Sequence, residues 1–491
     1  MVFSKKIKEC DLVIFGTKGD LSKRKLFPAL YQLEESLKLY KNTKIIGVGR
    51  ADWTQEYYKK IIKKYIKKFS YRKFKKKIWK KFSNRLYFCN IDVNKFSNFL
   101  KLKKIFKKEK KIKIYYFAIP QNTFKNIFKG LKKINYNYIQ DRIILEKPIG
   151  NSLETSKKIN NQVGKYFQEK QIFRIDHYLG KETILNLLSL KFSNSIFFTN
   201  WNKSTIDHIQ ITVAEKIGIE GRWNYFDKIG QMRDMIQNHL LQILCILTMS
   251  PPINLQSNSI RDEKLKILKS LRMINEKNVN KNTVRGQYKS GFFKNKNIPG
   301  YIDEINSIKN SNTETFVSIK VNIDNSQWHG VPFYLRTGKR LPLKHSEIVI
   351  YFKKNDFNLF NNFKKKLPLN KIVIRLEPNE GIDIFILNKI PKLDSKYELK
   401  EIKLNFDYKK TFNKCTLYNA YERLLLESFL GSQSLFVRRD EIEESWKWID
   451  SIINAWNKKK SKLELYTAGT WGPKSSNTLL KKDGRFWNKI K

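Results

Sequence analysis

The sequence contains few of the residues that build metal centres, disulfide frameworks or redox dithiols. Its four cysteines stand far apart, without a CxxC pair, at positions 10, 89, 245 and 415. This spacing argues against a disulfide framework, a zinc site and a redox motif, and it favours a reducing compartment. Histidine is also scarce, with five residues at positions 177, 208, 239, 329 and 345.

Long hydrophobic runs are absent as well. No stretch approaches the roughly 18 unbroken apolar residues that a membrane-spanning helix needs. The N-terminal segment MVFSKKIKECDLVIFG has an apolar run that is too short for a signal peptide. We therefore expect a protein that neither crosses a membrane nor is secreted, and we place it in the cytoplasm.

Acidic residues are outnumbered, because 98 lysines and arginines face 45 acids and leave a formal charge of +53. Taken alone, such a charge would suggest a nucleic-acid or anionic-membrane partner. The lysines, however, are spread through the chain, as a codon bias toward A and T would produce. In the densest stretch, 59–81, apolar residues recur at helical spacing and lysines occupy the other face. We expect solvated helix faces and no specific nucleic-acid partner, with a polyanion-binding surface as the alternative.

The chain is long enough for two or three domains, since its 491 residues exceed what one hydrophobic core usually serves. In the first 150 residues, short β-branched or aromatic runs alternate with longer helical stretches. The expected strands are 11–16, 44–50, 85–91, 112–120 and 142–148. This alternation predicts a parallel, doubly wound α/β sheet.

The pattern changes from about residue 178. A long helical segment around 226–249 is followed by consecutive strand candidates at 315–323, 332–338, 347–353, 372–378 and 381–387. Strands without intervening helices predict an α+β domain with a large, mainly antiparallel sheet and helices. We therefore divide the chain into a nucleotide-binding domain, 1–177, and a substrate-binding and oligomerisation domain, 178–491.

A glycine turn follows the first expected strand and opens directly into a helix. Glycines at such a turn let the backbone approach a pyrophosphate, and the helix N-terminus supplies N–H groups and partial positive charge. The pattern is GxxGxxS rather than GxGxxG, so by itself it is a weak signal for a Rossmann-like site. The expected cofactor-binding residues are Gly16, Thr17, Lys18, Gly19, Asp20 and Leu21.

The end of the second expected strand indicates which dinucleotide this turn binds. An acid usually stands there and accepts from the ribose 2′-hydroxyl of NAD, but here the strand ends in Arg50. A cation would suit the 2′-phosphate of NADP, and Lys18 could add a second. We infer NADP over NAD, although Asp52 is close enough to leave NAD open.

Two segments concentrate the groups that acid–base chemistry needs. His239 lies in an expected apolar helix together with Asp234 and Asn238, although a lone histidine there is more often a core residue. The segment RIDHYLGKE (174–182) packs an acid, an imidazole, a phenol and an ammonium into six positions. This density exceeds what ordinary structure requires and favours a site.

The motifs resemble those of the glucose-6-phosphate dehydrogenase family, and they stand in the order and at the distances along the chain that are typical of that family. The resemblance rests on GTKGDLSKRKL (16–26), EKP (146–148) and RIDHYLGKE (174–182). Supporting stretches are 220–242, 335–344 and 420–441, so the matches extend from about residue 11 to beyond 440.

The resemblance implies a role for each matching residue. His239 would be the general base on the anomeric hydroxyl, and Asp176 would orient and support it. The substrate-binding residues would be Lys147, His177, Tyr178, Lys181, Glu215, Asp234, Lys339 and Lys344. Lys147 would also contact the nicotinamide. The peptide bond before Pro148 is expected to have an unusual conformation, for which cis is the candidate.

The implied reaction is hydride transfer from C1 of glucose 6-phosphate to NADP, which gives 6-phosphoglucono-δ-lactone and NADPH, without a metal. It is the oxidative first step of the pentose phosphate pathway, and the resemblance implies a homodimer or homotetramer. Phe124 departs from the family, which often has a tyrosine there, and leaves only stacking or packing. A dehydrogenase of another sugar phosphate or a free aldose, and a basic nucleic-acid-binding protein with a degenerate fold, remain the alternatives.

Overall fold

The computed structural model describes most of the chain as two compact units, each with its own sheet. Unit 1 comprises 1–180, 252–261 and 418–443, and unit 2 comprises 181–251, 262–417 and 444–491. The structure describes residues 9–106, 111–136, 139–293, 296–304, 308, 310–354, 360, 367–393, 398–412 and 418–490. Cys415 lies outside these residues.

Unit 1 is built on a seven-stranded sheet in the order β17-β6-β5-β4-β1-β2-β3. Its strands are β1 (Cys10–Phe15), β2 (Ile45–Gly49), β3 (Leu86–Asn90), β4 (Ile112–Phe117), β5 (Arg142–Leu145), β6 (Ile172–Ile175) and β17 (Phe436–Val437). All neighbours are parallel except β17, which runs antiparallel to β6. Leaving β17 aside, this is the strand order of a doubly wound dinucleotide-binding domain, whose ligand crevice lies at the carboxyl ends of the strands, beside β1.

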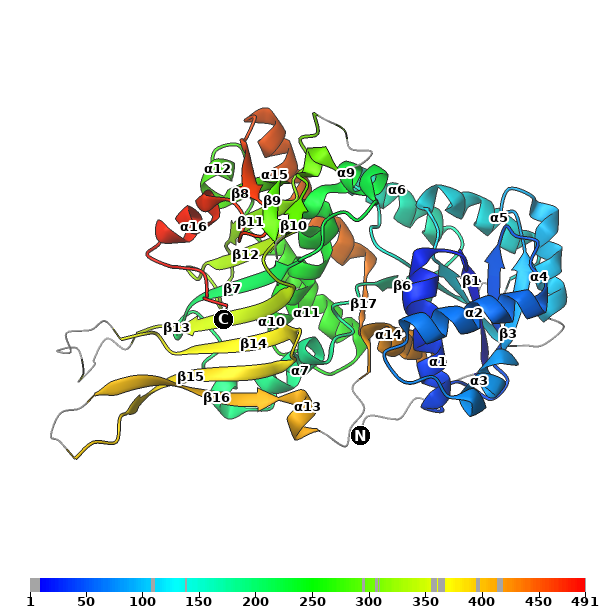
Figure 1. Cartoon of the computed structure of the whole chain (residues 1–491), viewed down its shortest axis with the longest axis horizontal. Coiled ribbons are helices and arrows are strands. Elements are labelled where there is room, and N and C mark those ends of the chain that lie inside the picture. The colour runs from blue at the N-terminus through cyan, green and yellow to red at the C-terminus, as the bar shows by residue number, and fades with distance from the viewer. Residues whose placement is uncertain are drawn as a thin grey trace. The chain divides into compact units, whose positions relative to one another are not determined.

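Helices connect these strands, as the alternating sequence pattern predicts (Figure 1). They are α1 (Phe27–Glu35), α2 (Gln55–Phe69), α3 (Lys76–Ser83), α4 (Phe99–Phe106), α5 (Phe124–Lys133), α6 (Leu153–Gly164) and, from the late segment, α14 (Ala420–Leu430). The lysine-rich stretch 59–81 divides into parts of α2 and α3. In α2 the residues Tyr58, Ile62 and Ile66 are buried, while Lys64, Lys67 and Lys68 are exposed.

Unit 2 is built on a nine-stranded sheet in the order β16-β15-β14-β13-β7-β12-β11-β8-β18 (Figure 1). The strands are β7 (Ile206–Ala214), β8 (Thr283–Lys289), β11 (Phe316–Val321), β12 (Phe333–Gly338), β13 (His345–Phe352), β14 (Lys371–Glu377), β15 (Gly381–Lys389), β16 (Leu399–Asp407) and β18 (Leu463–Thr467). Two neighbouring pairs, β7 with β12 and β8 with β18, are parallel and the others are antiparallel. The expectation of a large, mainly antiparallel sheet with helices is therefore confirmed.

A segmented helical stretch runs against this sheet and covers much of the expected helix at 226–249. It consists of α9 (Trp223–Gln231), the π-helix η5 (Met232–Leu240) and α10 (Leu241–Thr248). The break between α9 and η5 falls at Gly230, whose φ of 71° favours glycine. η5 packs on β12, and α7 (Glu182–Phe192) packs on β14. Within the described residues no helix combines the length and apolarity needed to cross a bilayer.

Candidate functional site

The glycine turn after β1 forms the first part of the site, in unit 1. Gly16 has a φ of 91°, and a Cβ there would lie 2.2 Å from the carbonyl oxygen of Ala118. The turn is closed by the Gly19 N–H and the Ser22 hydroxyl, which both donate to the Gly16 carbonyl at 2.9 Å. The chain then enters a π-helix, η1 (Ser22–Leu26), and α1. The position therefore requires a residue without a side chain, as a backbone that must approach a bound phosphate does.

The expected cofactor-binding side chains of this turn differ in accessibility. Thr17 is buried and its hydroxyl lies 3.2 Å from that of Tyr58, so it supports the turn from inside. Lys18 is exposed, with its Nζ 5.3 Å from the centre of the Trp53 ring. Asp20 is exposed and accepts from Arg24 at 2.7 Å. Lys18 is thus a cation on the outer surface of the turn.

The end of β2 carries the residues that bear on NADP against NAD. Arg50 directly follows β2 and is exposed. Asp52 is also exposed, but its Oδ1 accepts from the amide of Asn90 at 2.8 Å. One oxygen of the Asp52 carboxylate is thus engaged by this amide, and a carboxylate can accept several hydrogen bonds.

The EKP and RIDHY motifs follow two adjacent parallel strands of unit 1, β5 and β6. Lys147 and Pro148 come after β5 and are joined by a cis peptide bond. Asp176 comes directly after β6, is 1% exposed, and accepts from the backbone N–H of Tyr178 at 2.9 Å. Because carboxyl ends of parallel strands meet at one edge of a sheet, the two motifs share the edge that also bears the glycine turn.

A half-buried acid beside Lys147 connects this edge to the late segment of unit 1. Glu146 accepts hydrogen bonds from the hydroxyls of Tyr116 and, at 3.4 Å, of Tyr421. Burial raises the pKa of Glu146 to about 7. The Tyr421 ring also stacks with His177, with ring centres 6.3 Å apart. Tyr421 thus joins the EKP and RIDHY motifs from α14.

In unit 2, the parallel pairing of β7 and β12 brings together Glu215 and Lys339, the first residues after these strands. Nζ of Lys339 donates to Oε2 of Glu215 at 2.8 Å and lies 4.0 Å from Oδ2 of Asp234. Lys339 is 2% exposed, so this is a buried cation held by two carboxylates. Gln231 completes the group, because its Nε2 donates to Oγ1 of Thr337 at 2.8 Å and lies 3.4 Å from Oε2 of Glu215.

Asp234 and His239 are carried by the π-helix η5. The wider turn of a π-helix brings residues five apart closer to one face than an α-helix does, and such turns are frequent at functional sites. His239 is fully buried, and its backbone N–H donates to Oδ1 of Asn238 at 2.6 Å. The expected base and one expected sugar-binding acid thus share a single distorted helix.

Two further expected cations of unit 2 converge on one carboxylate. Lys181 precedes α7, and its Nζ lies 3.1 Å from Oε1 of Glu377. Nζ of Lys344 lies 3.2 Å from the other oxygen of the same carboxylate. Burial raises the pKa of Glu377, but the two ammonium groups together hold it below its usual value. The residues expected to bind phosphate therefore surround an ionised acid.

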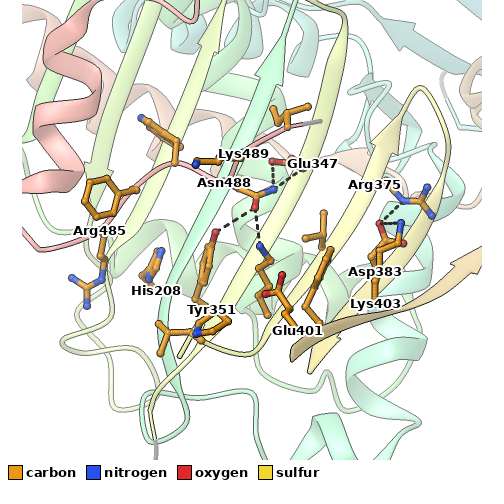
Figure 2. Close-up of a pocket in the computed structure, with 18 of the residues that line it drawn as sticks. His208, Glu347, Tyr351, Arg375, Asp383, Glu401, Lys403, Arg485, Asn488 and Lys489 are labelled. Carbon is orange, nitrogen blue, oxygen red and sulfur yellow. Dashed lines mark hydrogen bonds and ion pairs between the residues drawn. The ribbon is translucent and has the colours of Figure 1, made fainter. Parts of the chain in front are cut away.

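Unit 2 also contains a cavity of about 1540 Å³ over strands β13, β14 and β15, beside the C-terminal segment (Figure 2). The Asn488 amide donates to Glu347 at 3.1 Å and its oxygen accepts from Lys371 at 3.3 Å, while His208 stacks on Tyr351 with ring centres 4.3 Å apart. Lys344 is the one expected site residue that lines this cavity. The buried Lys339 cluster is a separate structure.

The sequence did not single out Gln231 or Glu377. Gln231 stood inside a recognised motif, and only its hydrogen bonds distinguish it from its neighbours. For Glu377, its position before a proline at the end of an expected strand was a usable signal.

Phe124, the departure from the family pattern, is 2% exposed and packs against Phe117 with ring centres 4.9 Å apart. Its role is in the core of unit 1.

Comparison with known proteins gives matches over nearly the whole chain. Residues 13–186 match the family model "Glucose-6-phosphate dehydrogenase, NAD binding domain" and residues 188–488 match "Glucose-6-phosphate dehydrogenase, C-terminal domain". The glucose-6-phosphate 1-dehydrogenase of Buchnera aphidicola subsp. Schizaphis graminum is 60% identical, covering 97% of this chain and 98% of the relative. That of Dickeya dadantii is 53% identical over the full length of both. A solved glucose-6-phosphate dehydrogenase in complex with its substrate glucose 6-phosphate is 33% identical, with a TM-score of 0.89 over 98% of this chain and 99% of the other.

Proposed function

The chain belongs to the glucose-6-phosphate dehydrogenase family, and we propose that it oxidises glucose 6-phosphate at C1 with NADP. The product is 6-phosphoglucono-δ-lactone, together with NADPH, and the reaction is the first oxidative step of the pentose phosphate pathway. The observation that carries the proposal is the buried Lys339 cluster, which includes Glu215 and Asp234. Asp234 of this cluster lies on the same π-helix as His239, which supports the assignment of both to one sugar phosphate.

The cofactor proposal rests on the turn after β1 and on the end of β2. Gly16 must lack a side chain because a Cβ there would lie 2.2 Å from the Ala118 carbonyl oxygen, and the turn opens into a helix as a pyrophosphate-binding turn does. Arg50 and Lys18 are exposed cations suited to a 2′-phosphate. Lys147 would contact the nicotinamide, and the bound NADP would supply the hydride acceptor.

The substrate proposal assigns the phosphate to the cations and the sugar to the acids. The phosphate would be held by His177, Tyr178, Lys181, Lys339 and Lys344, and Lys147 would also bind the substrate. Clustered cations and donors are what a dianion requires. Glu215 and Asp234 would accept from sugar hydroxyls, which orients C1 for transfer.

His239 would take the proton of the C1 hydroxyl as hydride leaves the carbon. An imidazole suits this task near neutral pH, and a supporting carboxylate would stabilise the imidazolium that forms. Asp176 would be that carboxylate. We also propose that 1–177 is the NADP-binding domain and that 178–491 is the substrate-binding and oligomerisation domain.

We also propose a cytoplasmic homodimer or homotetramer without a specific nucleic-acid partner. Light scattering after size exclusion measures the assembly, and a monomer at micromolar concentration would contradict this part. Absorbance at 340 nm with NADP and either glucose 6-phosphate or glucose tests the substrate. The proposal expects rapid reduction with the phosphate ester alone, because free glucose cannot engage the lysines, and equal rates would contradict it.

A further inference from the structure

A buried acid outside the expected site residues holds the start of the helix that carries His239. Oε1 of Glu314 accepts from the backbone N–H of Met232, the first residue of η5, at 3.0 Å. The Glu314 carbonyl accepts from the backbone N–H of Gln231 at 2.9 Å. One residue therefore satisfies two successive N–H groups where α9 breaks and the π-helix begins.

The break itself is fitted to this acid. A Cβ on Gly230 would lie 2.4 Å from Oε1 of Glu314, and the φ of 71° also favours glycine. Glu314 is 7% exposed, and burial raises its pKa. An acid is costly to bury, and an apolar residue of similar size is often at least as stabilising when only packing is needed. The presence of Glu314 therefore indicates a task that packing cannot perform.

The next residue, Thr315, connects the start of η5 to the Lys339 cluster. Its carbonyl accepts from the backbone N–H of Lys339 at 2.9 Å, and its hydroxyl lies 3.0 Å from that of Tyr466. Glu314 is thus bonded to the start of η5, and Thr315 is bonded to the backbone of Lys339. A single peptide unit joins these two residues and so limits how far the start of η5 can move relative to the Lys339 backbone.

We propose that Glu314 is a positioning residue, which sets the helix bearing Asp234 and His239 in register with Lys339 and Glu215. It acts through the Met232 N–H and has no contact with the substrate in this account. The inference deepens the proposed function and rests on it for the identity of the substrate. Loss of the acceptor would let the start of η5 shift, and a misplacement of about 1 Å at a reacting group costs up to about a hundredfold in rate.

The test compares three substitutions in the full chain by steady-state kinetics at 340 nm, corrected for the folded fraction. Glu314→Ala removes the acceptor and Glu314→Asp withdraws it by one methylene, whereas Glu314→Gln retains an oxygen at the same reach. The Ala and Asp variants are expected to lose about tenfold to a hundredfold in kcat and to show a raised KM for glucose 6-phosphate. The KM for NADP is expected to stay unchanged, and the Gln variant to remain within about threefold of the parent protein.

Asp383→Ala is the matched control, because Asp383 is also a buried carboxylate of unit 2 and pairs with Arg375 at 3.3 Å. It should lower stability without changing either KM. A purely structural role would reduce the folded fraction in all variants and leave the kinetic constants of the remainder unchanged, which would overturn the proposal. A Gln variant as slow as the Ala variant would also overturn it. An inactive parent protein would instead contradict the proposed function.

Discussion

The carboxylate between Lys181 and Lys344 yields a quantitative prediction for the proposed phosphate site. Glu377 lies 3.1 Å and 3.2 Å from the two ammonium groups and is ionised at neutral pH, because they hold its pKa below the usual value. If Lys181 and Lys344 bind the substrate phosphate as proposed, that phosphate shares the two ammonium groups with another negatively charged group, the carboxylate of Glu377. Glu377→Gln removes that competitor and keeps the shape of the side chain.

The size of the effect follows from the charges. A dianion whose phosphorus lies about 5 Å from the carboxylate is repelled by about 1.7 kcal/mol at the dielectric constant of water. Glu377 is 29% exposed, so screening reduces this value while partial burial increases it. We therefore use about 1–2 kcal/mol, which corresponds to a five- to thirtyfold lower KM for glucose 6-phosphate if KM follows binding.

The assay is initial-rate kinetics at 340 nm with saturating NADP, at low and at high salt. The Gln variant should show the lower KM for glucose 6-phosphate, an unchanged KM for NADP and a smaller advantage at high salt. Lys203→Gln is a control, since it also changes one charge of unit 2 but lies outside the proposed site. A raised KM in the Gln variant would refute the reasoning and show that Glu377 orders the lysines for the substrate.

Two further predictions concern unit 1. Arg50→Ala should lower kcat/KM with NADP about ten- to hundredfold and leave the NAD value within about twofold, because a charged hydrogen bond contributes about 1.5–3 kcal/mol. Equal losses with both cofactors would contradict the role of Arg50. Burial raises the pKa of Glu146 from 4.5 to about 7, so the folded protein retains a proton that the unfolded chain releases in this window. Stability should therefore fall as pH rises from 4.5 to 7, and Glu146→Gln should remove about 3 kcal/mol of this decline. Unfolding midpoints of both proteins across this range measure the difference, and parallel curves would contradict it.

The sequence predicted the nucleotide-binding sheet well because its strands are continuous β-branched runs between helices. It missed β6, since Ile172–Ile175 is a strand of four residues, the last two of which are the first two of the RIDHY motif. It also missed β7, where Ile206–Ala214 mixes apolar with polar residues. Short or mixed strands are recognised only through the neighbours with which they pair, and these are distant in sequence.

The helix at 226–249 shows a different limit. Its apolar periodicity predicts one continuous helix, whereas Gly230 interrupts it and a π-helix follows. At this break Glu314, which lies more than eighty residues later, occupies the space beside Gly230 and accepts from the backbone N–H of Met232. Likewise, the segment 418–443 belongs to unit 1 through contacts such as that of Tyr421 with Glu146, which no local pattern announces.

The candidate site was predictable to the extent that it follows strand ends and motifs. The proximity of Glu215 and Lys339 follows from two parallel strands, although the sequence did not reveal that β7 and β12 are neighbours. Glu377 and Gln231 could not be assigned, because their importance lies in hydrogen bonds and ion pairs made across the sheet of unit 2. Which residues bind the substrate and the cofactor remains a prediction.

The most direct test of the account is the rate of NADP reduction by glucose 6-phosphate in the parent protein and in His239→Asn, with Asp234→Asn measured alongside. Absorbance at 340 nm reports the product. If His239 is the base, the His239→Asn variant should stay folded, bind NADP with unchanged affinity and lose about a hundredfold or more in kcat, since general-base catalysis contributes that much. A folded His239→Asn variant with the parent kcat would contradict the central claim.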